Sequence, residues 1–405
     1  MTTGLPPGRL LPLLLLVLSP ALHAAEWRLT PELGVQEEYD DNIRLVAGPH
    51  DNAWGTVLKP AVELAMRTEV TTFTGKGRFE LGRYSGQRGL DSNDAFLDLS
   101  ASRKLERGDL GLDASAARDT TLRTGAFNPD TGLVVDKVGR TTYSATLHGS
   151  YLLNERTRGE LRYQWQSASY DNGERLGLFD YRYRVPSASL VYQYGPQLAF
   201  TGSFSHSRLD FTIPTDFVSE TNSGDLGAIY QWSERLQLRA SAGRRHTRST
   251  RTPFLALFGL QVPIGRVTTS NSGSVYRASA NYKYEAGSLD LDASRTATPS
   301  STGTETDDTE FDVTARRRFS PKLSGEVAAR YLQTRIVGGT LTVLNSDQDL
   351  LLVQPVLRWH FTEHWTLSGH YRYRRVKRRG TGQTATSNAI LATLRYQWQP
   401  WSVSR

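Results

Sequence analysis

From residue 26 onward, apolar and polar residues alternate in segments of about ten positions, as expected for β-strands with one apolar and one polar face. The clearest segment sets Leu367, Gly369, Tyr371 and Tyr373 against Ser368, His370, Arg372 and Arg374. Segments within 161–166, 276–284 and 394–398 repeat this alternation. The pattern predicts an all-β chain, because no comparable run has the helical period.

Aromatic residues flank a series of short polar turns that separate these segments. The aromatic residues in question are Tyr194, Trp232, Tyr284, Phe319, Trp359, Phe361, Trp365 and Trp398. Trp and Tyr rings favour the zone where hydrocarbon meets lipid headgroups. We therefore expect these residues to form an interfacial aromatic girdle beside periplasmic turns.

Longer connections rich in Gly, Pro, Asn and Asp alternate with the short turns, at residues 39–53, 120–140, 247–270 and 334–347. They are the expected extracellular loops. The whole pattern predicts a transmembrane antiparallel β-barrel of about 18 strands, within a range of about 16–18, with about nine such loops and about eight short turns. Both ends of the mature chain would then lie in the periplasm.

A soluble propeller or β-solenoid is the rival fold, but the apolar faces carry Gly, Ala or Leu centrally and aromatic residues at one end, as a lipid-facing band does.

The first residues read as a secretory signal. Arg9 precedes the apolar run Leu10 to Leu18, and Ala24 and Ala25 offer small residues for cleavage. The run is too short to cross a bilayer. We predict a cleaved signal peptide at residues 1–24 and an outer-membrane β-barrel at residues 25–405, in a Gram-negative cell.

The composition fits this picture once the two-residue period is considered. The chain has 405 residues, 38% of them hydrophobic, and a mean hydropathy of −0.45. Such low hydropathy is compatible with a barrel, whose strands need an apolar residue only at alternate positions. The net charge of +7 comes from dispersed Arg residues, so nucleic acid is not an expected partner. The absence of cysteine excludes disulfides and a lipidated cysteine.

The mature N-terminus carries a recognisable motif, Tyr39, Asp40, Asp41 and Asn42, after which a second strand contains Pro60. This opening resembles the "porin 2" family of outer-membrane β-barrels, some of which accompany exopolysaccharide or exosortase systems. The resemblance implies an integral outer-membrane barrel, with export or assembly of a surface polysaccharide as a function and periplasmic export components as partners. It brings no catalytic residues. The C-terminus departs from the usual pattern, because the chain does not end on the terminal aromatic residue of a final strand.

Charged residues on the polar face suggest a wet lumen, since unpaired charges in a dry interior are costly. The inward bases are expected to be Lys59, Arg67, Lys76, Arg78, Arg162, Arg239, Arg277, Lys283, Arg316, Arg318, Arg330, Arg358, Arg372, Arg374 and Arg395. The inward acids are expected to be Glu63, Glu80, Asp98, Asp113, Glu160, Asp290, Asp292, Glu310, Asp312 and Glu326. Selectivity for anionic solutes or an acidic polysaccharide is one interpretation, with His370, Arg372, Arg374, Arg358, Arg395, Arg316 and Arg318 as candidate selectivity residues. Cross-strand ladders of Arg and carboxylate that stiffen the wall are the other.

Three segments suggest metal chemistry, and each has a simpler explanation. His360 to His364 spells an inverted zincin site, which requires a helix, whereas this segment is predicted as strand, turn and strand. The Tyr39–Asn42 motif and Asp307-Asp308 offer oxygen ligands for calcium, but strand-ending turns explain both pairs of acids. We predict no catalytic residue, metal or cofactor.

The leading hypothesis is a passive outer-membrane channel for polar or anionic solutes, or for export of a surface polysaccharide. The alternative is a structural or partner-binding barrel with a plugged lumen, and an outer-membrane hydrolase comes last. Outer-membrane lipid is an expected partner in each case. The oligomeric state is left open by the sequence.

Overall fold

The computed structural model describes residues 25–124, 136–211, 217–252, 254–257, 260–263, 265–300, 304–337 and 347–404. The predicted signal peptide, residues 1–24, lies outside the described residues.

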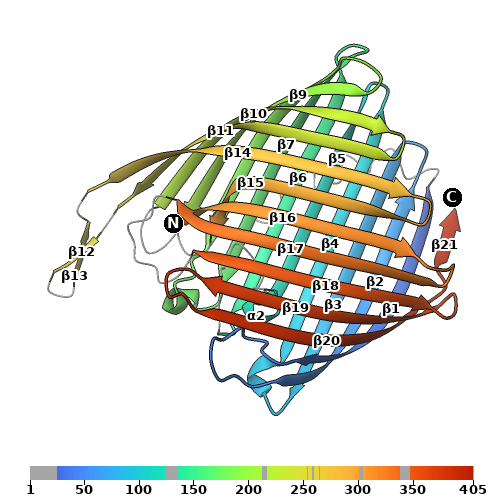
Figure 1. Cartoon of the computed structure of the whole chain (residues 1–405), viewed down its shortest axis with the longest axis horizontal. Helices are drawn as coiled ribbons and strands as arrows, with labels where there is room; N and C mark the ends of the chain where they lie inside the picture. Colours follow the sequence, from blue (N-terminus) through green and yellow to red (C-terminus); the bar gives the residue numbers. More distant parts are fainter. Residues whose placement is uncertain are drawn as a thin grey trace.

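Eighteen long strands form one antiparallel sheet that closes on itself, because β1 pairs with both β2 and β20 (Figure 1). The barrel strands are β1 (Glu26–Asp40), β2 (Ala53–Arg67), β3 (Thr71–Ser85), β4 (Ser92–Leu105), β5 (Gly108–Thr120), β6 (Gly139–Leu152), β7 (Thr157–Tyr170), β8 (Tyr181–Gln193), β9 (Leu198–Phe211), β10 (Phe217–Ser233), β11 (Leu236–Arg251), β14 (Val267–Tyr284), β15 (Gly287–Ser300), β16 (Thr304–Arg318), β17 (Leu323–Val337), β18 (Gln348–His360), β19 (Trp365–Arg378) and β20 (Thr384–Gln397). Three short helical turns, η2 (Arg88–Leu90), α2 (Thr121–Thr124) and η4 (Gly173–Leu176), lie in the connections. The structure confirms the predicted barrel and its strand number.

The last strand continues past a bulge. β20 pairs with β1 as far as Glu32 and Gln397, and β21 (Trp401–Ser404) resumes the pairing at Leu29 and Trp401. The C-terminal side therefore holds one more residue than the facing segment of β1, which defines a β-bulge. Pro400 lies in this bulge, where its missing N–H breaks no ladder. The unusual C-terminus is thus paired in the sheet.

The outer wall is apolar. Large hydrophobic residues point outward from nearly every strand; Val35, Leu58, Phe79, Leu97, Leu161, Leu190, Leu226, Val313, Leu357, Ile390 and Leu394 are examples. Leu226 and Leu161 are 76% and 69% exposed, which a water-soluble protein would not tolerate across a whole wall. The barrel is therefore an integral protein of the Gram-negative outer membrane, with this band in lipid. Within the described part of the chain, no helix is long and apolar enough to cross a membrane.

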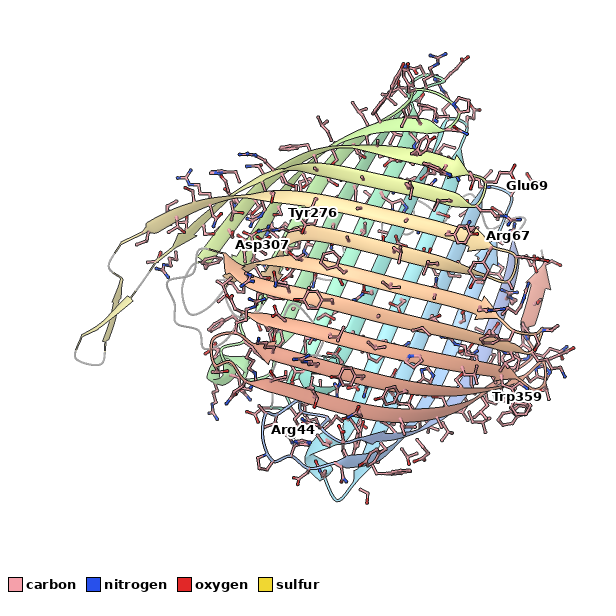
Figure 2. All side chains as sticks on the ribbon, viewed as in Figure 1. Arg44, Arg67, Glu69, Tyr276, Asp307 and Trp359 are labelled. Atoms are coloured by element: carbon pink, nitrogen blue, oxygen red, sulfur yellow. The ribbon has the colours of Figure 1, made fainter. Side chains whose placement is uncertain are left out.

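The predicted aromatic residues gather at the short-turn end of the barrel. Figure 2 shows Trp359 at this end, on the same side as Arg67 and Glu69 of the β2–β3 turn region. The rings of Trp365, Tyr396 and Trp398 form a chain with centroid separations of 4.8 Å, and Phe361 lies 5.4 Å from Trp359. Two further short turns, at 68–70 and 106–107, carry no such aromatic pattern.

The long-loop end differs from expectation at residues 247–270. β11 and β14 remain paired out to Arg251 and Val267, and the short strands β12 (Phe254–Leu257) and β13 (Leu260–Pro263) form a further hairpin. Figure 1 shows this hairpin projecting beyond the barrel rim. The Gly and Pro residues of this segment indicated a loop, but Pro is tolerated in edge strands, and a two-stranded hairpin consists only of edge strands. Several other connections at this end are also short, such as residues 301–303 between β15 and β16.

Candidate functional site

The strand register places the predicted selectivity residues on the inner wall. They lie on four strands: Arg316 and Arg318 on β16, Arg358 on β18, His370, Arg372 and Arg374 on β19, and Arg395 on β20. Several of them are joined by carboxylates. Glu326 Oε2 accepts from Arg316 Nε and Arg358 Nη1, each at 3.3 Å, and Asp290 lies 2.8 Å from Arg316 Nη1. This part of the wall is a charge ladder.

Arg372 and Arg374 lie in a denser cluster, in which Arg374 is buried and Arg372 is half-buried. Arg372 Nη2 lies 3.1 Å from both Glu38 Oε1 and Asp40 Oδ2, and Arg374 Nη2 lies 2.6 Å from the same Asp40 oxygen. Asp40 is fully buried, and Ser387 Oγ donates to its other oxygen at 2.8 Å. These two guanidinium groups are therefore neutralised, and they hold the wall together instead of facing a free solute path.

The register also changes the predicted charge balance. Further inward acids are Glu26, Glu32, Glu38, Asp40, Asp94, Asp109, Asp119, Asp225 and Asp308. Further inward bases are Arg28, Lys104, Arg140, Arg158, Arg245 and Arg378. The additional acids reduce the expected excess of bases, largely because the first strand carries four that sequence reasoning left out. A selectivity based on total lumen charge is correspondingly weak.

The Tyr39–Asn42 motif forms a clip at the barrel seam. Tyr39 faces outward and packs on Trp54, whereas Asp41 accepts from both the backbone and side-chain nitrogens of Asn388 at 2.7 Å. Asn42 donates to the Thr386 carbonyl oxygen at 2.9 Å, and its own amide donates to Asp40 Oδ1. Each carboxylate thus has protein donors, as the turn interpretation requires.

The chain after this clip turns into the barrel. Leu45 has a φ of +50°, a left-handed conformation that is unfavourable for a residue with a branched side chain. Its fully buried side chain packs with inward-facing residues of the last four strands, namely Leu332, Leu350, Val376 and Ala385. This packing holds residues 41–47 inside the lumen at the long-loop end.

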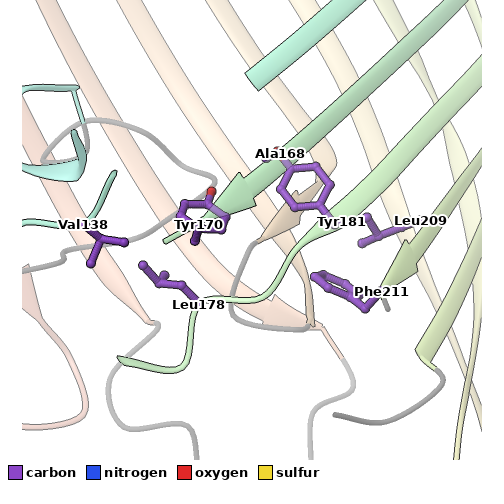
Figure 3. Packing of buried hydrophobic residues seen from close by; sticks show 7 residues of the cluster. All are labelled: Val138, Ala168, Tyr170, Leu178, Tyr181, Leu209 and Phe211. Carbon is purple, nitrogen blue, oxygen red and sulfur yellow. The ribbon is translucent and has the colours of Figure 1, made fainter. Parts of the chain in front are cut away.

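A second connection covers the opposite part of the inner wall. Figure 3 shows Leu178, from the connection between β7 and β8, beside Val138 and the inward-facing Tyr170, Tyr181 and Phe211. Ala168 and Leu209 complete the cluster. The lumen is therefore narrowed by apolar contacts on two sides, whereas the inner wall nearer the short turns is polar.

The tip of the β15–β16 hairpin also lies inside the barrel. Glu305 is buried, and its carboxylate accepts from Ser219 at 3.0 Å and from Thr221 at 2.8 Å, both on the inner face of β10. Asp307 lies 3.3 Å from Arg245 on β11 and 2.7 Å from Arg295. The β14–β15 ladder stops at Tyr276 and Arg295, which frees the tip to bend inward.

Asp307 and Asp308 were expected in a turn, and this expectation is wrong. Both lie within β16, because the connection to β15 occupies only residues 301–303. Sequence reasoning did not detect the inward tip. Its signal would have been the acidic run from Glu305 to Asp308 opposite an inward Arg245.

A polar cavity of about 920 Å³ lies between this tip and the wall of β6 to β11 and β14. Ser and Thr are the most frequent residues of its lining, and residues 296–298 of β15 complete it. Arg162, Arg239 and Arg277 also line the cavity, and among the described residues none of these three forms an ion pair. The other Arg residues of the cavity lining, Arg158 and Arg245, are paired with Glu160 and Asp307, so these three carry the charge available to a solute inside the cavity.

The segment from His360 to His364, which matches the inverted zincin motif, does not form a helix. β18 ends at His360 and β19 begins at Trp365, so the segment is strand, turn and strand, as predicted. His360 Nδ1 lies 2.9 Å from Thr366 Oγ1, and His364 packs on Tyr396. No group of three metal-ligating side chains occurs within the ranges that the structure describes.

No protein-family model matches the sequence. No curated protein matches it either. The resemblance to the "porin 2" family accordingly stays a prediction.

Several solved structures are similar in outline to the barrel. OpdQ of Pseudomonas aeruginosa has 9% identity and a TM-score of 0.45 over 93% of this chain and 98% of its own. OpdL of the same organism has 13% identity and a TM-score of 0.42, over 93% and 99%. The ferric-catecholate import receptor Fiu of E. coli has 8% identity and a TM-score of 0.48, over 91% and 81%. Likeness at this level carries no information about function.

Proposed function

We propose that the protein is a porin-like passive channel for small polar solutes, with a preference for anions set by Arg162, Arg239 and Arg277. The observation that carries the proposal is the hydroxyl-lined cavity of about 920 Å³ inside a charged wall. A wall of this polarity is stable only when wetted or fully paired, because an unpaired buried charge is costly. Water in this part of the lumen is the expected medium for solute passage.

The anion preference is local. The pairing of Arg372 and Arg374 with Glu38 and Asp40 removes the strongest cluster predicted from the sequence. Arg239 and Arg277 lie on the neighbouring strands β11 and β14, where Arg277 is two residues from Ser279, the register partner of Arg239. They are thus diagonal neighbours on the inner face, and their charges add at one place in the cavity. Their influence extends over about one Debye length, roughly 10 Å at 0.1 M salt.

Reversal potentials in a planar bilayer test this proposal. Under a salt gradient, the unmodified barrel should give an anion-selective sign that fades in molar salt. The double variant Arg239→Ser, Arg277→Ser should move the potential toward zero. The matched control Arg103→Ser, Arg317→Ser removes two outward-facing charges and should leave it unchanged. Equal shifts in both variants would contradict the assignment.

A plugged, partner-dependent barrel is the second candidate. Two segments that occupy lumen space favour this candidate: residues 41–47 and the β15–β16 tip. Inserted protein that passes no current, but conducts once residues 41–47 are released, would select this candidate. Polysaccharide passage rests only on the sequence resemblance, and the proposal does not extend to it.

A further inference from the structure

The outer wall carries a concentration of bases on three strands at the long-loop end. This basic patch consists of Arg182, Arg184, His206, Arg208, Arg244, His246 and Arg248, from β8, β9 and β11. The register brings Arg184 opposite Arg208, and Glu220 of β10 opposite both Arg208 and Arg248. The seven residues therefore belong to one continuous surface.

Acids neutralise only part of this patch. Asp210 lies 3.3 Å from Arg184 and 2.9 Å from Arg208, and Glu220 lies 3.0 Å from Arg208. Arg182, Arg244 and Arg248 are exposed, and no acid of the described chain forms an ion pair with them. The patch is therefore net positive, with three guanidinium groups available to a ligand.

The patch begins where the lipid-facing band ends. Along the outward face of β11, Leu236, Leu238, Ala240 and Ala242 are followed by Arg244, His246 and Arg248. On β8 the outward series Leu190, Ala188 and Pro186 is followed by Arg184 and Arg182. Short turns of such barrels face the periplasm, so the patch lies at the headgroup level of the outer leaflet.

An apolar groove of about 1320 Å³ runs along the outer wall across β4 to β11, from Leu105 and Leu153 near the short turns toward the patch. Leu161, Leu190, Phe204 and Leu226 line it, and it extends to Ala242, two residues from Arg244. Gly202 and Gly224 hollow the wall between the larger side chains; a Cβ at Gly224 would meet its nearest neighbour at 3.7 Å. The groove is wide enough for hydrocarbon chains rather than a single side chain.

We propose that the groove and the basic patch together bind one phosphorylated glycolipid of the outer leaflet, a molecule of the lipid A class. Its acyl chains would fill the groove, and its phosphates would contact Arg244, Arg248 and Arg182. Guanidinium groups bind phosphate oxygens through paired, charge-assisted hydrogen bonds, and Arg244 and Arg248 lie on the same outward face of β11. The inference concerns the outer wall and is independent of the proposed channel function.

Native mass spectrometry of the full barrel in detergent, titrated with bis-phosphorylated lipid A, tests the site. The double variant Arg244→Ser, Arg248→Ser should weaken binding by about tenfold or more, a change of at least about 1.4 kcal/mol. The control Arg103→Ser, Arg317→Ser removes two outward charges at the other end and should bind normally. The variant Arg244→Lys, Arg248→Lys keeps the charge without paired donors and should show an intermediate loss. Heat-dependent gel mobility checks that each barrel is folded. If the Ser variant does not fold, the binding of the Lys variant tests the site in its place.

Two further arms separate the phosphates from the acyl chains. Dephosphorylated lipid A should bind weakly to the native barrel. Its affinity should match that of intact lipid A for the Ser variant. Gly224→Leu should weaken lipid A binding by filling the groove, whereas millimolar inorganic pyrophosphate should displace little of the lipid. Undiminished binding by the Ser and Lys variants, or equal binding of the dephosphorylated lipid, would overturn the proposal. Complete displacement by pyrophosphate would reassign the patch as a free-phosphate site and would also overturn it.

Discussion

Arg374 on β19 reaches across β20 to Asp40 at the end of β1, with 2.6 Å between Nη2 and Oδ2. Ser387 of β20 lies between the two groups and bonds to both. Three strands are thus tied at the place where the first and last strands of the barrel meet. Since Asp40 is fully buried and Arg374 is nearly so, each charge depends on the other.

Replacing Asp40 should therefore weaken barrel closure. Asp40→Ala leaves Arg374 and part of Arg372 uncompensated, and removal of one partner from a buried pair costs about 3–5 kcal/mol. We expect a lower urea midpoint for the loss of the folded, fast-migrating form on gels. The exposed pair of Arg118 and Asp171 is the control, where Asp171→Ala should cost less than about 1 kcal/mol. An unchanged midpoint for Asp40→Ala would show that the tie does not hold the seam.

Leu45 should control how far residues 41–47 stay inside the lumen. Leu45→Ala removes most of a fully buried side chain, and such truncations cost about 2–5 kcal/mol. This lost free energy weakens the packing of residues 41–47 against the inner wall and not the barrel itself. Single-channel conductance should therefore rise while the barrel stays folded. Leu153→Ala, in the exposed β6–β7 turn, should leave conductance as it is. Equal conductance of the Leu45 variant and the native barrel would place the constriction elsewhere.

The lipid-facing wall should reject charge at Leu394. This residue lies opposite Val35 and Leu367 on the outward face. Leu394→Arg should lower folding stability in lipid vesicles by about 2–4 kcal/mol if the residue is near the bilayer midplane. Gln397→Arg, three positions along the same strand and opposite the inward Glu32, should fold normally. Similar stability of the two variants would contradict the assigned faces of β20.

Orientation can be tested by labelling, because the natural chain has no cysteine. A membrane-impermeant maleimide added to intact cells should react with Asp51→Cys, in the connection between β1 and β2. It should not react with Glu234→Cys, in the β10–β11 turn, until the outer membrane is permeabilised. Labelling of position 234 in intact cells would reverse the barrel and place the basic patch in the inner leaflet.

The strand pattern and the two faces of each strand follow from the order of residues along the chain. Leu394 and Arg395, for example, face opposite sides because successive side chains of a strand alternate, whatever the strand pairs with. The turns beside Trp232 and Trp359 were equally predictable, since they join neighbouring strands through a few local residues. These features depend on interactions within one hairpin.

The filling of the lumen and the pairing of its charges depend on the closed barrel. Asp40 and Arg374 are 334 residues apart, and Glu305 and Thr221 are 84 apart, so no local pattern pairs them. Residues 41–47 and the β15–β16 tip read as surface connections, yet both lie inside the barrel because a closed wall offers them buried partners. The outer patch likewise forms only when β8, β9 and β11 are held in register within the sheet. The alternation within one strand shows which way a side chain points, but it does not give the distance to a side chain on another strand.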